Sequence, residues 1–147
     1  MKTIFDKNTR DEIIRRVVFL HENSTPVWGK MTPYQMLKHC SLWEEMAQGK
    51  TTYKQVLIGK LVGRFVLKSI LKNEAPLRRN APSTPDLVIT YDGNVELQKK
   101  IWIGLLEEYE NFVEFDFIHP FFGRVTTSQI GMLAYKHADH HLRQFNC

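Results

Sequence analysis

Apolar residues three and four positions apart recur along most of this chain, and this helical periodicity constrains its fold more than any other feature. Five segments show it, and no segment alternates apolar and polar residues strictly enough for a confident strand. Residues 87–91, Leu-Val-Ile-Thr-Tyr, could form one short extended piece. We therefore predict an all-α fold with helices over residues 9–21, 32–49, 54–72, 94–115 and 126 to near the C-terminus.

Capping residues mark several of the predicted helix ends. In a capping box, a threonine side chain and a glutamate or glutamine side chain three residues later each accept a hydrogen bond from the other residue's backbone N–H. Pro33 suits the first position of the second helix, and Gly49 suits the left-handed residue that follows its last turn. Capping-box spacing occurs at Thr9 with Glu12, at Thr32 with Gln35 and at Thr126 with Gln129.

The length and composition indicate one globular domain over residues 1–147. The chain has a mass of 17.3 kDa, and 43% of its residues are hydrophobic and 24% are charged, as in ordinary globular proteins. It contains no run of about 18 apolar residues that would span a membrane, and the N-terminus lacks the apolar region of a secretory signal. Cys40 and Cys147 cannot make a disulfide framework, so we expect a cytoplasmic protein with reduced cysteines and no membrane partner.

The 54–72 segment combines an apolar side with a row of basic residues. Lys60, Arg64, Lys68 and Lys72 recur every four residues, in a chain whose net charge is +4. Such a row could bind phosphates or nucleic acid, but it lacks the interleaved aromatic side chains on which bases stack. We favour a solvated helix face and expect no nucleic-acid partner. The apolar side consists of Leu57, Ile58, Leu61, Val62, Phe65, Val66 and Ile70.

The last predicted helix holds the most informative residues. At about 100° per residue, the inward stripe that starts with Ile130, Leu133 and Ala134 continues into polar side chains on the same face. These polar residues are His137, His140, His141 and Gln144. Because buried polar groups need partners, this end of the stripe must meet something that coordinates it or forms hydrogen bonds with it.

His137 and His141 have the spacing of a pair of metal ligands. Residues four apart on a helix place two imidazoles side by side, although such a pair arises easily by chance among six histidines. The H-E-x-x-H pattern of zinc metalloproteases is absent, because Ala138 follows His137 and no glutamate stands there as the base. Asp139 lies about 200° around the helix from His137, so we expect it to be solvated and to point away from the pair.

His39 is the candidate for a third ligand. It lies at the edge of the core stripe that Met36, Cys40, Trp43 and Ala47 form on the second predicted helix. Three imidazoles from two packed helices would leave a coordination position open, as in a reactive metal site. The alternative is a half-buried His39 that is bonded to a backbone carbonyl.

Several neighbours could complete a pocket around these three histidines. His140 could lie beside the pair, and Gln144 could orient a ligand histidine or simply cap the helix. Trp43 could line the pocket or belong to the core. Arg78 and Arg79, on the proline-rich loop that precedes residue 94, are the candidates for holding a carboxylate or phosphate group.

Four stretches of the chain resemble the DinB-like superfamily, and most closely its uncharacterised DUF1569 branch. They are WGKMTPYQMLKHC (28–40), PLRRNAPSTP (76–85), HPFFG (119–123) and YKHADHHLRQF (135–145). The resemblance extends over nearly the whole chain, and the H-x-x-H-H-x-x-Q pattern of the last helix is its most specific part. It implies a four-helix bundle in up-down-down-up order, in which the 54–72 helix and the proline-rich loop form the long crossover between the second and fourth predicted helices.

The resemblance also implies a metal centre. The metal triad of the superfamily falls on His39, His137 and His141, with zinc or nickel as the divalent ion, and imidazole ligands suit either metal. Some DinB-like relatives are thiol-dependent transferases or metal-dependent hydrolases. By this analogy we predict a homodimeric metal-dependent enzyme that acts on a small-molecule substrate, with a low-molecular-weight thiol as one candidate. The alternatives are a metal-binding module without catalysis and a helical protein whose histidines are structural.

Overall fold

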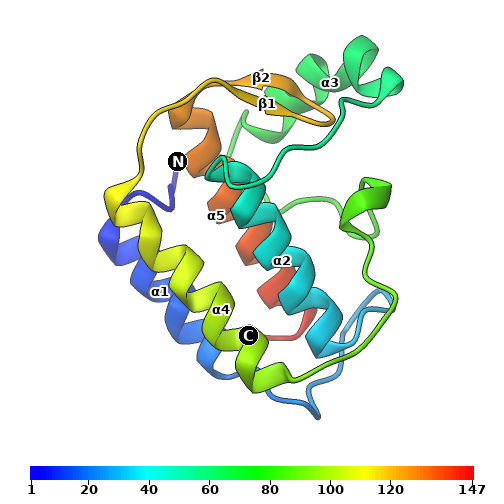
Figure 1. The fold of residues 1–147 in the computed structure, drawn as a ribbon, viewed down its shortest axis with the longest axis vertical. Helices are drawn as coiled ribbons and strands as arrows, with labels where there is room; N and C mark the ends of the chain where they lie inside the picture. The colour runs from blue at the N-terminus through cyan, green and yellow to red at the C-terminus, as the bar shows by residue number, and fades with distance from the viewer.

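Five α-helices dominate the computed structural model, which describes residues 1–147, and a two-stranded sheet is the other regular element (Figure 1). The helices are α1 (Lys7–Val18), α2 (Pro33–Ala47), α3 (Leu57–Ile70), α4 (Val95–Glu107) and α5 (Thr127–Gln144). Strands β1 (Phe117–His119) and β2 (Gly123–Val125) pair antiparallel, and 3₁₀ turns cover Pro85–Leu87 and Glu108–Asn111. No helix has both the length and the apolar run that a membrane span requires.

Helices α1, α2, α4 and α5 enclose the core. Helix α2 packs against both α4 and α5, and α1 packs against the same two helices (Figure 1). Each of the four contributes a side chain that is fully or almost fully buried: Ile13, Met36, Trp102 and Ile130. Because α2 and α5 lie against each other, polar residues on their facing sides are brought together inside the molecule.

The predicted capping boxes of α2 and α5 are confirmed. Thr32 and Gln35 bond reciprocally at the start of α2, and Thr126 and Gln129 do the same at the start of α5. Gly49 takes the left-handed conformation after α2, with φ at 75°. These helix ends were predictable because a capping box satisfies backbone N–H groups with residues that are close in sequence.

The predicted start of α1 is wrong. Asp6 caps this helix, and its carboxylate accepts hydrogen bonds from the backbone N–H and the hydroxyl of Thr9, at 2.8 and 2.7 Å. Aspartate is at least as good an N-cap as threonine, and Thr9 then occupies the third helical position. The helix also stops at Val18, because Phe19 and Leu20 donate to carbonyls three residues back and tighten the last turn.

A β-hairpin replaces the linker that we expected before the last helix, so the all-α prediction is wrong in this segment. Phe117 pairs with Val125 and His119 with Gly123. In the turn, Nδ1 of His119 accepts hydrogen bonds from the backbone N–H groups of Phe121 and Phe122. Strands of three residues are too short to show alternation. The expected extended piece over 87–91 is also absent, because Leu87 ends a 3₁₀ turn and no strand follows it.

Helix α3 lies at one end of the molecule beside the hairpin and turns most of its apolar side outward (Figure 1). An apolar helix side usually faces a core. Here the packed side consists of Gly59, Gly63 and Leu67, and a Cβ at either glycine would collide with the backbone carbonyl of Phe121. The glycines therefore let the helix and hairpin backbones approach each other closely. The five exposed apolar residues are Leu57, Ile58, Leu61, Val62 and Phe65.

Helix α4 is shorter than the predicted 94–115 segment. It gives way to the 3₁₀ turn after Glu107, and the chain continues without regular structure to the hairpin. Leu105 of α4 and Tyr109 of the 3₁₀ turn are buried, whereas Ile101 of α4 is exposed.

Candidate metal centre

His39, His137 and His141 come together where α2 packs on α5. Each offers one ring nitrogen, and these three nitrogens lie within 4.8 Å of one another. The Nε2 atoms of His39 and His137 are 3.0 Å apart, and the ring of His141 lies 4.7 Å from each of the other two rings, centre to centre. The structure therefore brings together the three histidines that the sequence singled out.

Hydrogen bonds settle which ring nitrogen carries the proton on two of these histidines. Nδ1 of His39 lies 2.9 Å from the carbonyl oxygen of Leu87, which can only accept, so Nδ1 carries the hydrogen. Nδ1 of His141 lies 2.9 Å from Oε1 of Gln144, whose amide nitrogen donates to the carbonyl of Trp28. Gln144 therefore accepts from His141. In both rings the Nε2 lone pair is left free, as a metal ligand requires.

His137 is not fully satisfied by protein partners. Its Nδ1 is buried and has no hydrogen-bond partner. Its Nε2 faces Nε2 of His39, to which it can donate a hydrogen when no cation is bound. A cation that replaced this hydrogen would be held by imidazole nitrogens from two helices. The donor set of three imidazole nitrogens fits a divalent ion of the zinc or nickel type.

Burial keeps the three imidazoles neutral. It lowers the pKa of His39 below the ordinary value, and it lowers those of His137 and His141 further, assisted by the charge that neighbouring histidines would carry. The neutral form is the one that binds a metal. Cys40 is no ligand, because it lies in the core with its thiol against the sulfur of Met36 and burial raises its pKa.

Two further aromatic rings surround the histidines. Trp43 is buried and stacks on His137, with ring centres 4.9 Å apart and planes 20° from parallel. His140 is half-buried, and its ring stands edge-on to His141 at 5.1 Å and 5.6 Å from Trp28. The three histidine rings are therefore confined by packing from both helices and from the linker that carries Trp28.

The two arginines of the proline-rich loop differ in their surroundings. The guanidinium of Arg79 lies over the ring of Trp28, 4.2 Å from its centre, so this side chain reaches the periphery of the site. Arg78 is exposed and makes no hydrogen bond or ion pair. The structure thus places Arg79, but not Arg78, near the histidines.

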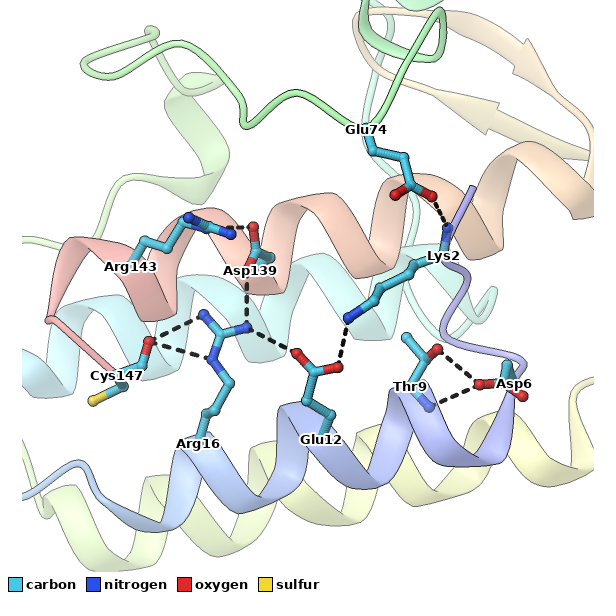
Figure 2. Close-up of polar contacts among 9 residues, drawn as sticks. All are labelled: Lys2, Asp6, Thr9, Glu12, Arg16, Glu74, Asp139, Arg143 and Cys147. Atoms are coloured by element: carbon cyan, nitrogen blue, oxygen red, sulfur yellow. Dashed lines mark hydrogen bonds and ion pairs between the residues drawn. The ribbon is translucent and has the colours of Figure 1, made fainter.

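Asp139 points away from the histidines as predicted, but the prediction of a solvated side chain is wrong. It is buried and accepts from Arg16 at 2.8 Å and from Arg143 at 2.7 Å (Figure 2). Arg16 also donates to the carbonyl of Cys147. The reason is that α1 covers this side of α5, so a position that the periodicity of α5 leaves outside the core still meets another helix.

Sequence reasoning missed the groups that orient the ligands from outside the helices. The carbonyls of Leu87 and Trp28 belong to loops, and every residue has a carbonyl, so no residue type marks them.

The sequence pattern also did not single out Glu44. It is fully buried on α2, accepts a hydrogen bond from the Tyr109 hydroxyl at 2.5 Å, and has its pKa raised to about 8 by burial.

No curated protein and no solved structure matches the chain. A family model does match it over residues 4–147, and its description is "Protein of unknown function (DUF1569)". This match includes both helices that carry the histidines. The chain therefore belongs to the DUF1569 family.

Proposed function

We propose that this protein binds one divalent metal ion through His39, His137 and His141 and uses it as a metal-dependent enzyme of the transferase or hydrolase type. The convergence of three ring nitrogens within 4.8 Å supports this proposal most directly. Two of the rings are held by hydrogen bonds that leave Nε2 free. A buried structural histidine would need no such convergence, because one carbonyl or water satisfies it.

Three protein ligands are fewer than zinc or nickel takes, so a coordination position remains for a small molecule. When bound, the ion supplies Lewis-acid chemistry, which makes a water or a thiol a better nucleophile at neutral pH. The chain's own residues position the ligands: Gln144 holds His141, the Leu87 carbonyl holds His39, and Trp43 packs against His137. Burial of the rings shields the ligand set from bulk water.

The family's place in the DinB-like superfamily is part of this proposal. The contacts of α1 and α2 with both α4 and α5 support an up-down-down-up four-helix bundle. The long segment between α2 and α4, which contains α3 and the proline-rich loop, supports the crossover that such an order needs. By this analogy the substrate class includes a low-molecular-weight thiol.

Elemental analysis of protein purified without a histidine tag tests the metal site. We expect about one zinc or nickel ion per chain for the wild type and almost none for His137→Ala, because two imidazoles hold an ion far more weakly than three. His21→Ala is the matched control, since His21 is exposed and lies outside the cluster, and its metal content should equal that of the wild type. A metal content that does not respond to His137→Ala would contradict the proposal.

A reactivity screen separates the enzyme from a metal-binding module. Metal-loaded protein is offered electrophiles with several low-molecular-weight thiols, and hydrolysable esters without them. We expect turnover that a chelator abolishes, that added metal restores and that His137→Ala lacks. Inertness toward all of these substrates in protein that holds its full metal content would favour the non-catalytic module.

A further inference from the structure

The outward side of α3 is an apolar face with nothing packed on it. Leu57, Leu61 and Phe65 are 74 to 79% exposed, and each follows the last by one helical turn. Ile58 and Val62 extend the same face, at 57 and 38%. Isolated exposed apolar residues are common, but five on one helix face make a continuous patch that marks an interaction surface.

Basic side chains border this face. Lys60, Arg64 and Lys68 form a row along one edge at four-residue spacing, and all three are exposed. Lys54 and Lys72 flank the helix, and residues 54–72 contain no aspartate or glutamate. An apolar face beside a basic row is the pattern of helices that lie in the surface of an anionic membrane.

The fold holds α3 with this face outward. Gly59 and Gly63 sit against the backbone of Phe121, the N–H of Val56 donates to the carbonyl of Pro120 at 2.9 Å, and Arg64 donates to the carbonyl of Arg124 at 2.9 Å. The helix is therefore presented at one end of the molecule, beside the hairpin (Figure 1). Because this geometry exists before any partner binds, little conformational entropy would be lost on docking.

Charge favours a lipid surface over a second copy of the chain as the occupant. An antiparallel pair of α3 helices would bring two basic rows to the same side. The groove that contains Glu107, Glu108 and Glu110 is also lined by Lys7, Arg10 and Arg15, so its charge is mixed. Ile14 is its one apolar residue, and it offers nothing to cover five apolar side chains. An anionic bilayer supplies both an apolar layer and a layer of phosphates at the required depths.

We propose that α3 is an interfacial helix that docks this protein on anionic lipid bilayers. The apolar face enters the boundary between headgroups and acyl chains, and Lys60, Arg64 and Lys68 contact lipid phosphates. This role requires no membrane span, but it replaces the expectation from the sequence that the protein has no membrane partner. It is independent of the metal centre, whose histidines lie on α2 and α5.

Sedimentation of the full chain with lipid vesicles tests the proposal. We expect binding to vesicles that contain phosphatidylglycerol, much weaker binding to pure phosphatidylcholine, and release at high salt. Phe65→Glu should weaken the partition coefficient about tenfold or more, because it places a charge in the apolar face. The matched control is Phe19→Glu, since Phe19 is 73% exposed but lies at the end of α1, and it should bind as the wild type does.

A second pair of variants tests the basic row. Lys68→Ala should weaken binding to the anionic vesicles about fivefold, and Lys100→Ala, an exposed lysine on α4, should leave it unchanged. All of these positions are exposed, so each variant should keep the circular dichroism spectrum of the wild type. His137→Ala should also bind vesicles normally. A failure of the lipid-docking proposal can therefore be distinguished from a failure of the metal-site proposal.

Three results would overturn the proposal. One is a lack of binding to either kind of vesicle, and another is equal binding by Phe65→Glu and the wild type. The third is a dimer in sedimentation equilibrium that Phe65→Glu converts to a monomer, with no vesicle binding, which would assign the face to a second copy of the chain.

Discussion

At the scale of single residues, the candidate centre depends on side chains that orient the ligands. Gln144 accepts from His141 and donates to the Trp28 carbonyl, so it links the ligand to the segment between α1 and α2. The spacing of three residues between His141 and Gln144 on one helix made this contact predictable. The contact of Gln144 with the Trp28 carbonyl was not predictable, because this carbonyl is a backbone group of a loop.

Removing this link should weaken metal binding without removing a ligand. For Gln144→Ala we expect an affinity about 10 to 100 times lower, because His141 loses the bond that sets its orientation and tautomer. The measurement is a competition titration against a chromophoric chelator. Gln129→Ala, on the same helix but in the capping box, is the control. Equal affinities for Gln144→Ala and the wild type would show that Gln144 plays no part in metal binding.

Glu44 should make the stability of the protein depend on pH. Its pKa is about 8 in the folded protein against 4.5 when unperturbed, so the folded state holds a proton that the unfolded state releases within this window. The free energy of unfolding should therefore fall as the pH rises from 4.5 to about 8, by up to about 1.4 kcal/mol per pH unit from this group. Below pH 4.5, where Glu44 is protonated in both states, its contribution to the free energy of unfolding is fully present.

Urea denaturation at several pH values measures this effect. Glu44→Gln should remove the contribution of Glu44 to the slope, because the amide cannot ionise and can still accept from Tyr109. Glu45→Gln, at the neighbouring and more exposed position, should keep the wild-type slope. If Glu44→Gln and the wild type show the same pH dependence, Glu44 is not the group responsible.

At the scale of the elements, the contact of α3 with the hairpin depends on glycines. For Gly63→Ala we expect a loss of about 1–3 kcal/mol in the stability of this contact, because the added methyl group meets the Phe121 carbonyl. Hydrogen exchange of residues 57–70 should become faster. Gly104→Ala is the control, since nothing lies within 4 Å of its Cβ position, and it should stabilise α4 by about 1 kcal/mol. Unchanged exchange in Gly63→Ala would contradict this account of the packing.

The helix ends and the hairpin show which elements a local sequence pattern can predict. The capping boxes of α2 and α5 were predicted correctly because every partner lies within one turn. The same spacing at Thr9 was misleading, because Asp6 is the N-cap of α1 and accepts a hydrogen bond from the backbone N–H of Thr9. The hairpin was missed because its pairing joins segments that are too short to show a pattern of their own.

At the scale of the whole molecule, an ion would join α2 to α5. A ligand that binds only the folded state adds about 2.7 kcal/mol of stability at a free concentration 100 times its Kd. Metal loading should therefore raise the melting temperature of the wild type, and a chelator should reverse the increase. His137→Ala should show no such response. A melting temperature that metal does not change would indicate that the ion does not bridge the two helices.

The ion-pair network around Asp139 joins other parts of the chain at the same scale. Arg16 of α1 contacts Asp139 of α5 and the backbone of Cys147, and Lys2 reaches Glu12, so both termini are tied to the helices (Figure 2). The sequence contains these charges, but their pairing depends on how α1 crosses α5. The expectation of a solvated Asp139 was wrong for that reason.

The sequence by itself determined which side chains share a face within each helix. Periodicity is a local property, and it placed His137, His141 and Gln144 on one side of α5 and His39 beside the core stripe of α2. Only the tertiary structure decided what each face meets: α2 opposite α5, loop carbonyls behind the histidines, α1 over Asp139, and the apolar side of α3 left outward. The physical reason is that burial and pairing depend on segments far apart in the chain, whose relative positions no local spacing encodes.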